Sequence, residues 1–236
     1  MGNYLAHMQG LGNSTAFIRR ADYNEYNFGE YIAHVENKSS AVLEIGPGLG
    51  ELLHVLNKHG IREIDILDND KAVLAYCQKK YFIRKAIFSQ GDSPHKYLKS
   101  KYDLIVLTQV FEHVPKSEYT TWIKGLYDAL KPGGYILITV PNGANPLVGA
   151  ERYGDLQHEN LFTVFSFNEL VTFSTLRGAK HQINGFEIPP ISAINIIRII
   201  LQKILHGFFI LLMIINGAIY QTLMTPNITL IIKKEK

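Results

Sequence analysis

The clearest chemical signal in the chain is a carboxylate followed by three glycines at strictly alternate positions: Glu44, Gly46, Gly48 and Gly50. The apolar run 41–43 precedes them, so the pattern predicts a strand, then a glycine-rich turn, then a helix. Because glycine has no Cβ, such a turn brings backbone N–H groups close to a bound ligand. A dinucleotide-binding fingerprint would require a further glycine where this chain has Glu51. The spacing therefore favours a different class of small-molecule site.

The pattern Glu-x-Gly-x-Gly-x-Gly resembles the first motif of the class I S-adenosylmethionine (SAM)-dependent methyltransferases. The resemblance implies a Rossmann-like, doubly wound α/β sheet of seven strands, of which the last is antiparallel. It also implies SAM as cofactor and S-adenosylhomocysteine as product, with Glu44, Gly46, Gly48 and Gly50 holding the methionine end of SAM. Pro47 departs from many relatives, but that position faces the ligand only through its backbone, so we expect binding to be retained.

Two more carboxylates follow predicted strands at the same edge of the sheet. Asp68 ends the second strand, where its carboxylate can accept both hydroxyls of a ribose, and Asn69 lies beside it. The alternative is that these residues only cap the helix that follows. Asp92 is expected where the third strand ends, at hydrogen-bond distance from the exocyclic amine of adenine. Its alternative is a turn residue, because Gly-Asp-Ser-Pro is also a favourable turn sequence.

A buried strand at 103–108 ends in a polar group: Gln109, Glu112 and His113. Together with Lys-Pro-Gly-Gly at 131–134, this segment resembles the methyltransferase branch that includes the ubiquinone-biosynthesis O-methyltransferases. The sequence Arg-Tyr-Gly-Asp-x-x-His-Glu-x-x-Phe-Thr at 152–163 is closer to bacterial methyltransferases encoded with cell-envelope polysaccharide genes. The resemblance covers about 43–185 and the last strand. It implies that Gln109 lines the face where the methyl group is transferred.

Two histidines are the candidate general bases for a hydroxyl acceptor. Methyl transfer is an in-line displacement for which the protein supplies alignment and proton removal, and histidine titrates near neutral pH. His113 could instead be a structural residue at a helix start, and His158 a surface loop residue. Tyr153, Asp155 and Glu112 are expected to shape the acceptor pocket. No His, Asp or Cys cluster has metal-ligand spacing along the sequence, so no metal is expected.

The elements that position these residues alternate between strands and helices. This order predicts βαβ units and a parallel sheet that is covered on both faces. The expected strands are 41–45, 64–67, 86–89, 103–108, 135–140 and a last strand at 228–233. The expected helices are 51–59, 71–81 and 118–130.

The chain is expected to divide into an N-terminal helical lid (1–40), a SAM-binding core (41–190), a helical insertion (191–225) and a final strand with its tail (226–236). The lid segment is rich in aromatic residues: Tyr4, Phe17, Tyr23, Tyr26, Phe28 and Tyr31. These rings could exclude water and stack on adenine or on a sugar face. Packing of the same rings against the sheet is an equally good interpretation.

The insertion at 191–225 is dominated by Ile, Leu and Phe. At 100° per residue, its polar side chains before Gly207 fall within an arc of about 140°; they are Ser192, Asn195, Arg198, Gln202, Lys203 and His206. Such a basic amphipathic helix suits a membrane interface. Packing against a protein, including a homodimer partner, is an alternative. A transmembrane span is disfavoured because the strand at 228–233 must rejoin the sheet.

Composition sets further bounds. A net charge of +3 in 236 residues gives no indication of a nucleic-acid-binding surface. The single cysteine, Cys77, excludes an internal disulfide, favours a reducing compartment and is expected to be a small buried hydrophobe. The N-terminus lacks the features of a signal peptide, so we expect a cytoplasmic protein attached peripherally to the inner membrane face.

The sequence thus predicts a SAM-dependent O-methyltransferase that acts on a glycan or lipid-linked precursor at the cytoplasmic membrane face. Methylation of a quinone or another lipid, and N-methylation, remain alternatives within the same chemistry. An alternative of another class is a non-catalytic SAM-binding module that serves as a scaffold.

Overall fold

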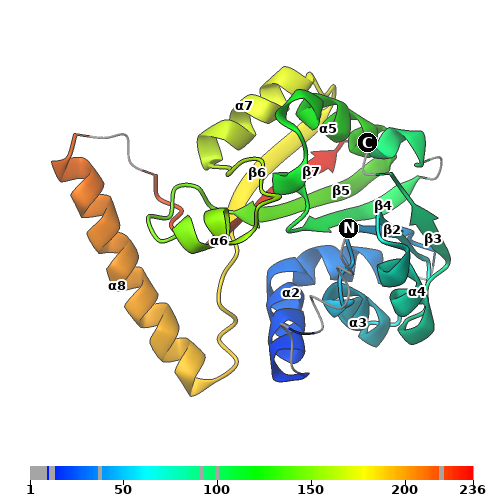
Figure 1. Ribbon diagram of the computed structural model, residues 1–236, viewed down its shortest axis with the longest axis horizontal. Coiled ribbons are helices and arrows are strands. Elements are labelled where there is room, and N and C mark those ends of the chain that lie inside the picture. Colours follow the sequence, from blue (N-terminus) through cyan, green and yellow to red (C-terminus); the bar gives the residue numbers. More distant parts are fainter. Residues whose placement is uncertain are drawn as a thin grey trace.

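The computed structural model describes residue 10 and residues 14–36, 39–90, 93–98, 101–217 and 221–235. Seven strands in this part of the chain form one sheet in the order β3-β2-β1-β4-β5-β7-β6 (Figure 1). The strands are β1 (Val42–Ile45), β2 (Ile64–Asp68), β3 (Lys85–Phe88), β4 (Tyr102–Thr108), β5 (Leu130–Pro141), β6 (Ala179–Gly185) and β7 (Asn227–Lys234).

Strand directions follow the predicted pattern. β1 to β5 pair in parallel, whereas β7 runs antiparallel to both of its neighbours, β5 and β6. The prediction of a doubly wound seven-stranded sheet with an antiparallel last strand is therefore confirmed. The sequence assigned no range to β6, because this edge strand is mostly polar and exposed and carries no apolar run.

Helices cover both faces of the sheet (Figure 1). The described helices are α2 (Ser14–Val35), α3 (Glu51–Lys58), α4 (Lys71–Lys80), α5 (Tyr119–Asp128), α6 (Gly149–Gly154), α7 (Val164–Ser174) and α8 (Ala193–Ile215), with short 3-10 turns η1 (Pro94–Lys96), η2 (Phe111–His113) and η3 (Lys116–Glu118). Apolar residues of α5 and α7 pack on one face of the sheet, and those of α2, α3 and α4 on the other. Cys77 of α4 is fully buried, as predicted for a small hydrophobe.

The N-terminal helix α2 packs against α3. Arg20 forms an ion pair of 2.6 Å with Glu51, the first residue of α3. Of the aromatic residues predicted to form a lid, Phe28 and Tyr31 are instead buried, because they pack against Phe186 and Tyr135. Tyr4 lies outside the described residues.

Three predicted lid rings remain. Tyr23 stacks on Phe186 and lines the large cavity, Phe17 contacts His54 edge-on, and Tyr26 is half exposed. Closure of this segment over a ligand stays a prediction.

The predicted helix at 118–130 and strand at 135–140 meet earlier than expected. α5 ends at Asp128, and β5 already begins at Leu130, so the Lys-Pro-Gly-Gly segment belongs to the strand. The register against β4 shifts between Tyr102 and Leu104, which is the irregularity that accommodates the segment. A Cβ on Gly134 would come within 2.8 Å of the Asp103 carbonyl oxygen, so only glycine allows this close approach.

Helix α8 stands apart from the sheet and from the other helices (Figure 1). None of its residues is buried. By length and composition, it is the one helix in the described part of the chain that could cross a membrane. The chain leaves β6, forms α8 and returns to β7, which pairs with β6 in the same sheet.

Candidate active site

The carboxyl ends of β1, β2 and β4 open into one cavity of about 1680 Å³. Such edges of parallel sheets are where α/β folds bind ligands. Nine of the predicted site residues line this cavity: Glu44, Gly46, Gly48, Asp68, Asn69, Gln109, His113, Asp155 and His158. Predicted site residues from four separate segments of the sequence therefore line the same cavity.

The glycine turn after β1 has the backbone that its sequence requires. Gly46, Gly48 and Gly50 have φ angles of 69°, 54° and 87°, in the left-handed region that disfavours side chains. A Cβ on Gly46 would lie 2.4 Å from Val110, and one on Gly50 would lie 2.2 Å from the ring of Tyr81. Gly50 is not among the residues that line the cavity, and its predicted contact with the cofactor stays a prediction.

Glu44 gives this end of the cavity an unpaired buried acceptor. The residue is only 5% exposed, and its Oε2 atom has no hydrogen-bond partner. Burial, with Glu51 and Asp68 nearby, raises the pKa of Glu44 well above its usual value. A carboxylate in this setting gains from a ligand that donates a hydrogen bond or carries positive charge.

Asp68 lies at the end of the next strand, and it is not the helix cap. The side chain of Asp70 caps α4 by accepting the backbone N–H of Ala72 at 2.7 Å. Asp68 accepts the N–H of Asp70 at 2.7 Å through Oδ1, which fixes the carboxylate at the cavity edge. Burial raises its pKa to about 6. Asp92, the predicted adenine contact, lies outside the described residues.

Gln109 lies where β4 meets the cavity. It has a φ of 56°, which is unusual for a residue with a side chain. Its backbone N–H donates to the Thr139 carbonyl, and its Nε2 donates to Oδ1 of Asn227, both at 2.9 Å. These bonds connect β4 to its neighbour β5 and to the start of β7. The strain is therefore held by contacts from two other strands.

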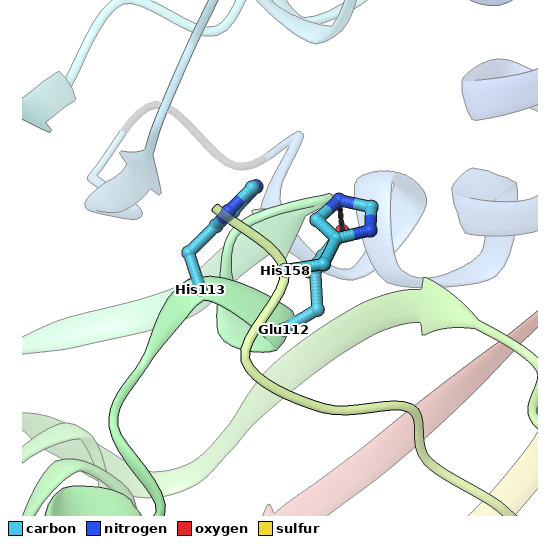
Figure 2. Close-up of side chains that lie close together, drawn as sticks. All are labelled: Glu112, His113 and His158. Carbon is cyan, nitrogen blue, oxygen red and sulfur yellow. Dashed lines mark ion pairs between the residues drawn. The ribbon is translucent and has the colours of Figure 1, made fainter. Parts of the chain in front are cut away.

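The other end of the cavity contains a cluster of Glu112, His113 and His158 (Figure 2). One donor atom from each residue lies within 4.8 Å of the other two. Nε2 of His158 is 4.0 Å from Oε1 of Glu112, and the two imidazole ring centres are 4.7 Å apart. The loop that carries His158 is held to η2 because the Glu159 N–H donates to the Glu112 carbonyl at 2.9 Å.

Burial shifts the pKa values of Glu112 and His158 in opposite directions. Glu112 is 0% exposed, neither of its carboxylate oxygens has a hydrogen-bond partner, and burial raises its pKa to about 8. Burial, and then the neighbouring His113, lower the pKa of His158. A neutral imidazole facing the cavity can accept a proton or act as a ligand.

The three residues predicted to shape the acceptor pocket lie at different positions relative to the cavity. Asp155 lines the cavity, and its Oδ1 accepts the N–H of Gln157 at 2.8 Å. Tyr153 is 79% exposed and is not among the lining residues, because α6 turns it toward solvent beside the Arg152 guanidinium. Its predicted role in shaping an acceptor pocket stays a prediction. Glu112 lies behind the cavity wall, next to His158.

The structure does not test the expectation that no metal is bound, but it assembles a group that could hold one. The sequence argument relied on ligand spacing along the chain, yet the fold brings Glu112 and His113 next to His158, 45 residues further on. A short-range spacing rule cannot detect a group that is assembled by two distant loops.

Sequence reasoning also missed cavity residues from other elements. Arg19 and Asn24 of α2, Arg198 and Gln202 of α8, and Asn227 at the start of β7 all line the cavity. Arg198 and Gln202 belong to the polar arc of α8, which was a signal that one face of that helix needed a polar neighbour. The others carried no signal in the sequence pattern.

Comparisons with known proteins agree with this geometry. A family model described as a methyltransferase domain matches residues 20–174, which is more than half of the chain. A SAM-dependent methyltransferase from Archaeoglobus fulgidus has a similar structure, with a TM-score of 0.63 and 19% identity over 97% of both chains. The plantazolicin methyltransferase BamL, solved with a triazolic desmethylPZN analog and SAH, gives a TM-score of 0.64 and 18% identity over 99% of this chain and 90% of that one.

A TehB-like SAM-dependent methyltransferase from Corynebacterium glutamicum gives a TM-score of 0.57 at 13% identity, over 98% of this chain and 95% of that one. At such identities the likeness extends to the fold alone. A search of curated proteins finds no match to the sequence.

Proposed function

The chain belongs to the methyltransferase domain family, and we propose that it uses SAM to methylate a hydroxyl group of a glycan or lipid-linked precursor at the cytoplasmic face of a membrane. The observation that carries the proposal is the single cavity that joins the glycine turn and Asp68 to the two histidines. A methyl donor at one end and an acceptor at the other would meet beside Gln109.

The residues at the glycine turn fit SAM. SAM supplies a methyl group on a positively charged sulfonium, together with an ammonium group and two ribose hydroxyls. The unpaired buried Oε2 of Glu44 and the carboxylate of Asp68 are acceptors for such donors. The left-handed turn at Gly46 and Gly48 lets the backbone approach the ligand without a Cβ in the way.

The histidine end supports a hydroxyl acceptor. Burial and the neighbouring His113 lower the pKa of His158, which favours the neutral imidazole that can receive the acceptor's proton. The positively charged SAM needs no leaving-group acid. The chain's task is therefore to align the acceptor oxygen and to remove one proton.

The composition and position of helix α8 support the proposed location at a membrane surface. Two side chains of its polar arc, Arg198 and Gln202, line the cavity. On the opposite side of the helix, the apolar residues are exposed by about half or more: Ile197, Ile204, Leu211 and Ile215. An apolar face of this kind gains free energy in a lipid interface. A lipid-linked acceptor would then reach the cavity from the membrane side.

A single crossing of the bilayer by α8 does not fit this topology. β6 and β7 flank the helix in sequence and pair in one sheet, so both ends of α8 must return to the same side. The return segment, residues 216–226, contains no helix in its described part that could cross back. An interfacial position is compatible with both connections.

The resemblance to cell-envelope polysaccharide methyltransferases favours a glycan or lipid-linked acceptor. The plantazolicin methyltransferases BamL and BpumL are solved with desmethylPZN analogs, so a peptide natural product is a competing acceptor. Quinone or lipid methylation, N-methylation and a non-catalytic scaffold make different predictions in the same assay.

The first test is calorimetric titration of SAM into the full chain and into Asp68→Ala. We expect micromolar binding that is lost in the variant; no binding to folded wild-type protein would defeat the proposal.

The second test incubates the enzyme with SAM carrying a labelled methyl group and with separate lipid-linked glycan, quinone and peptide fractions. We expect label in alkali-stable ether linkage in the glycan fraction. Label in the quinone or peptide fraction would favour that acceptor instead, and label on nitrogen would favour N-methylation. No label in any fraction would favour the non-catalytic scaffold.

The membrane contact is tested by flotation with vesicles that contain anionic lipid. A triple variant, Ile197→Gln, Ile204→Gln and Leu211→Gln, should lose vesicle binding. Its unfolding temperature and SAM affinity should not change, because none of the three residues is buried. Binding that survives the three substitutions would exclude α8 as the membrane contact.

A further inference from the structure

We propose that Glu112, His113 and His158 bind one divalent transition-metal ion at the acceptor end of the cavity. Metal binding is independent of the acceptor's identity, whereas the role of the ion in methyl transfer rests on the function proposed above.

The donor set comes from two segments that converge. Glu112 and His113 belong to η2, and His158 lies in the loop after α6 (Figure 2). Their donor atoms lie within 4.8 Å of one another. Metal bonds of about 2.0–2.2 Å place neighbouring donors roughly 3–4 Å apart, so small side-chain rotations complete the site.

Unsatisfied buried atoms are the second observation. Glu112 is 0% exposed, and both of its carboxylate oxygens lack a hydrogen-bond partner. Nδ1 of His158 is also buried without a partner. Nε2 of His158 is 4.0 Å from Oε1 of Glu112, which is too far for a hydrogen bond. A buried carboxylate without a partner is unfavourable, and a bound cation removes that cost.

His113 is oriented as metal-binding histidines usually are. Its Nδ1 lies 3.2 Å from the Gln157 carbonyl oxygen. A carbonyl can only accept a hydrogen bond, so Nδ1 carries the proton and Nε2 keeps its lone pair for a ligand bond. The N–H groups of Glu159 and Asn160 both point to the Glu112 carbonyl, which keeps the two segments in register.

The donor types select the class of ion. Two imidazoles and one carboxylate suit Zn²⁺, Fe²⁺ or Mn²⁺ and leave coordination positions open. Mg²⁺ and Ca²⁺ prefer sites built from oxygen ligands. Both histidines line the cavity, so the open positions face the space where the acceptor would lie.

An ion there would make an acceptor hydroxyl more acidic. The hydroxyl proton passes to solvent water, the oxygen's lone pair forms the new O–CH₃ bond, and the electrons of the broken S–CH₃ bond return to sulfur. In this arrangement the histidines are ligands, and neither needs to act as the general base.

The test uses the full chain, stripped of metal with a chelator and titrated with Zn²⁺ by calorimetry. We expect one ion per chain, and binding of Mg²⁺ at least a hundredfold weaker. Co²⁺ should give a visible absorption spectrum that is typical of nitrogen and oxygen ligands. SAM binding is measured on the same samples, so a failure of the cofactor proposal is distinguished from a failure of the metal proposal.

Matched variants locate the ion. Glu112→Gln keeps the shape of the side chain, and His158→Ala removes the imidazole. Each of these two single variants should weaken Zn²⁺ binding at least tenfold and abolish the Co²⁺ spectrum. His181→Ala, on the exposed strand β6, is the control and should bind the ion as wild type does. Thermal unfolding confirms that each variant is folded. Absence of stoichiometric binding, or binding unchanged in both cluster variants, would overturn the proposal.

Discussion

The two ends of the cavity are built in different ways. At the glycine-turn end, Glu44 and Asp68 project from the neighbouring strands β1 and β2, which pair residue by residue. At the histidine end, Glu112 and His158 come from loops 46 residues apart in sequence, joined by backbone hydrogen bonds from Glu159 and Asn160. Regular strand pairing fixes the first end, and the docking of one loop on another fixes the second.

The largest effect expected at the glycine-turn end comes from Gly50→Ala. The added Cβ would lie 2.2 Å from the ring of Tyr81, at a φ of 87°. We expect a loss of about 3 kcal/mol in the free energy of unfolding and no measurable SAM binding. Gly149→Ala is the control, because a Cβ added there would meet no atom within 4 Å and the helix should tolerate it. Denaturant unfolding and calorimetry measure both quantities; a Gly50→Ala protein as stable as Gly149→Ala would contradict the rigid turn.

The same contrast explains what could be predicted from the sequence. Asp68 was identified because the carboxyl ends of adjacent parallel strands meet at one edge, a rule that needs only strand order. The grouping of Glu112 with His158 depends on how two loops pack, and no local pattern encodes that distance. Tyr153 was expected in the pocket because its segment follows β5, but the turn of α6 points it to solvent. The edge strand β6 was not located because its polar residues lack strand periodicity.

At the histidine end, His158→Ala should lower kcat by about 10²–10⁴ while leaving SAM affinity unchanged. The reason is that His158 contacts the Glu112 and His113 end of the cavity, not the glycine turn. His181→Ala again serves as the control. Steady-state kinetics with the acceptor that the labelling assay identifies, and calorimetry with SAM, measure the two effects separately. An equal loss in SAM affinity would mean that the two ends are not independent.

Asp68→Asn should have the complementary effect. The amide cannot accept two ribose hydroxyls as a carboxylate does, so SAM affinity should fall roughly ten- to a hundredfold with little change in stability. Asp70→Asn is the matched control, since asparagine also caps helices well and Asp70 is the cap of α4. Calorimetric titration of both variants decides the point. A similar loss of affinity in both would show that the helix start, rather than the Asp68 carboxylate, controls binding.

The smallest expected effect is the pH dependence that Asp68 contributes. Ionisation of this residue should lower the stability of the ligand-free fold and raise the affinity for SAM. Burial raises the pKa of Asp68 from 3.8 to about 6, so the ligand-free fold favours the protonated form. Its share of the stability is therefore present at low pH and is lost as pH rises through about 6. SAM should require the ionised form, so its affinity should fall up to about tenfold per pH unit below pH 6. Glu44, whose pKa is also raised, acts in the same direction, and Asp68→Asn removes only part of the slope. Calorimetric titration of SAM from pH 5 to pH 8 measures the slope of affinity against pH in the wild type and in Asp68→Asn. Equal slopes in the two proteins would show that ionisation of Asp68 does not control SAM binding.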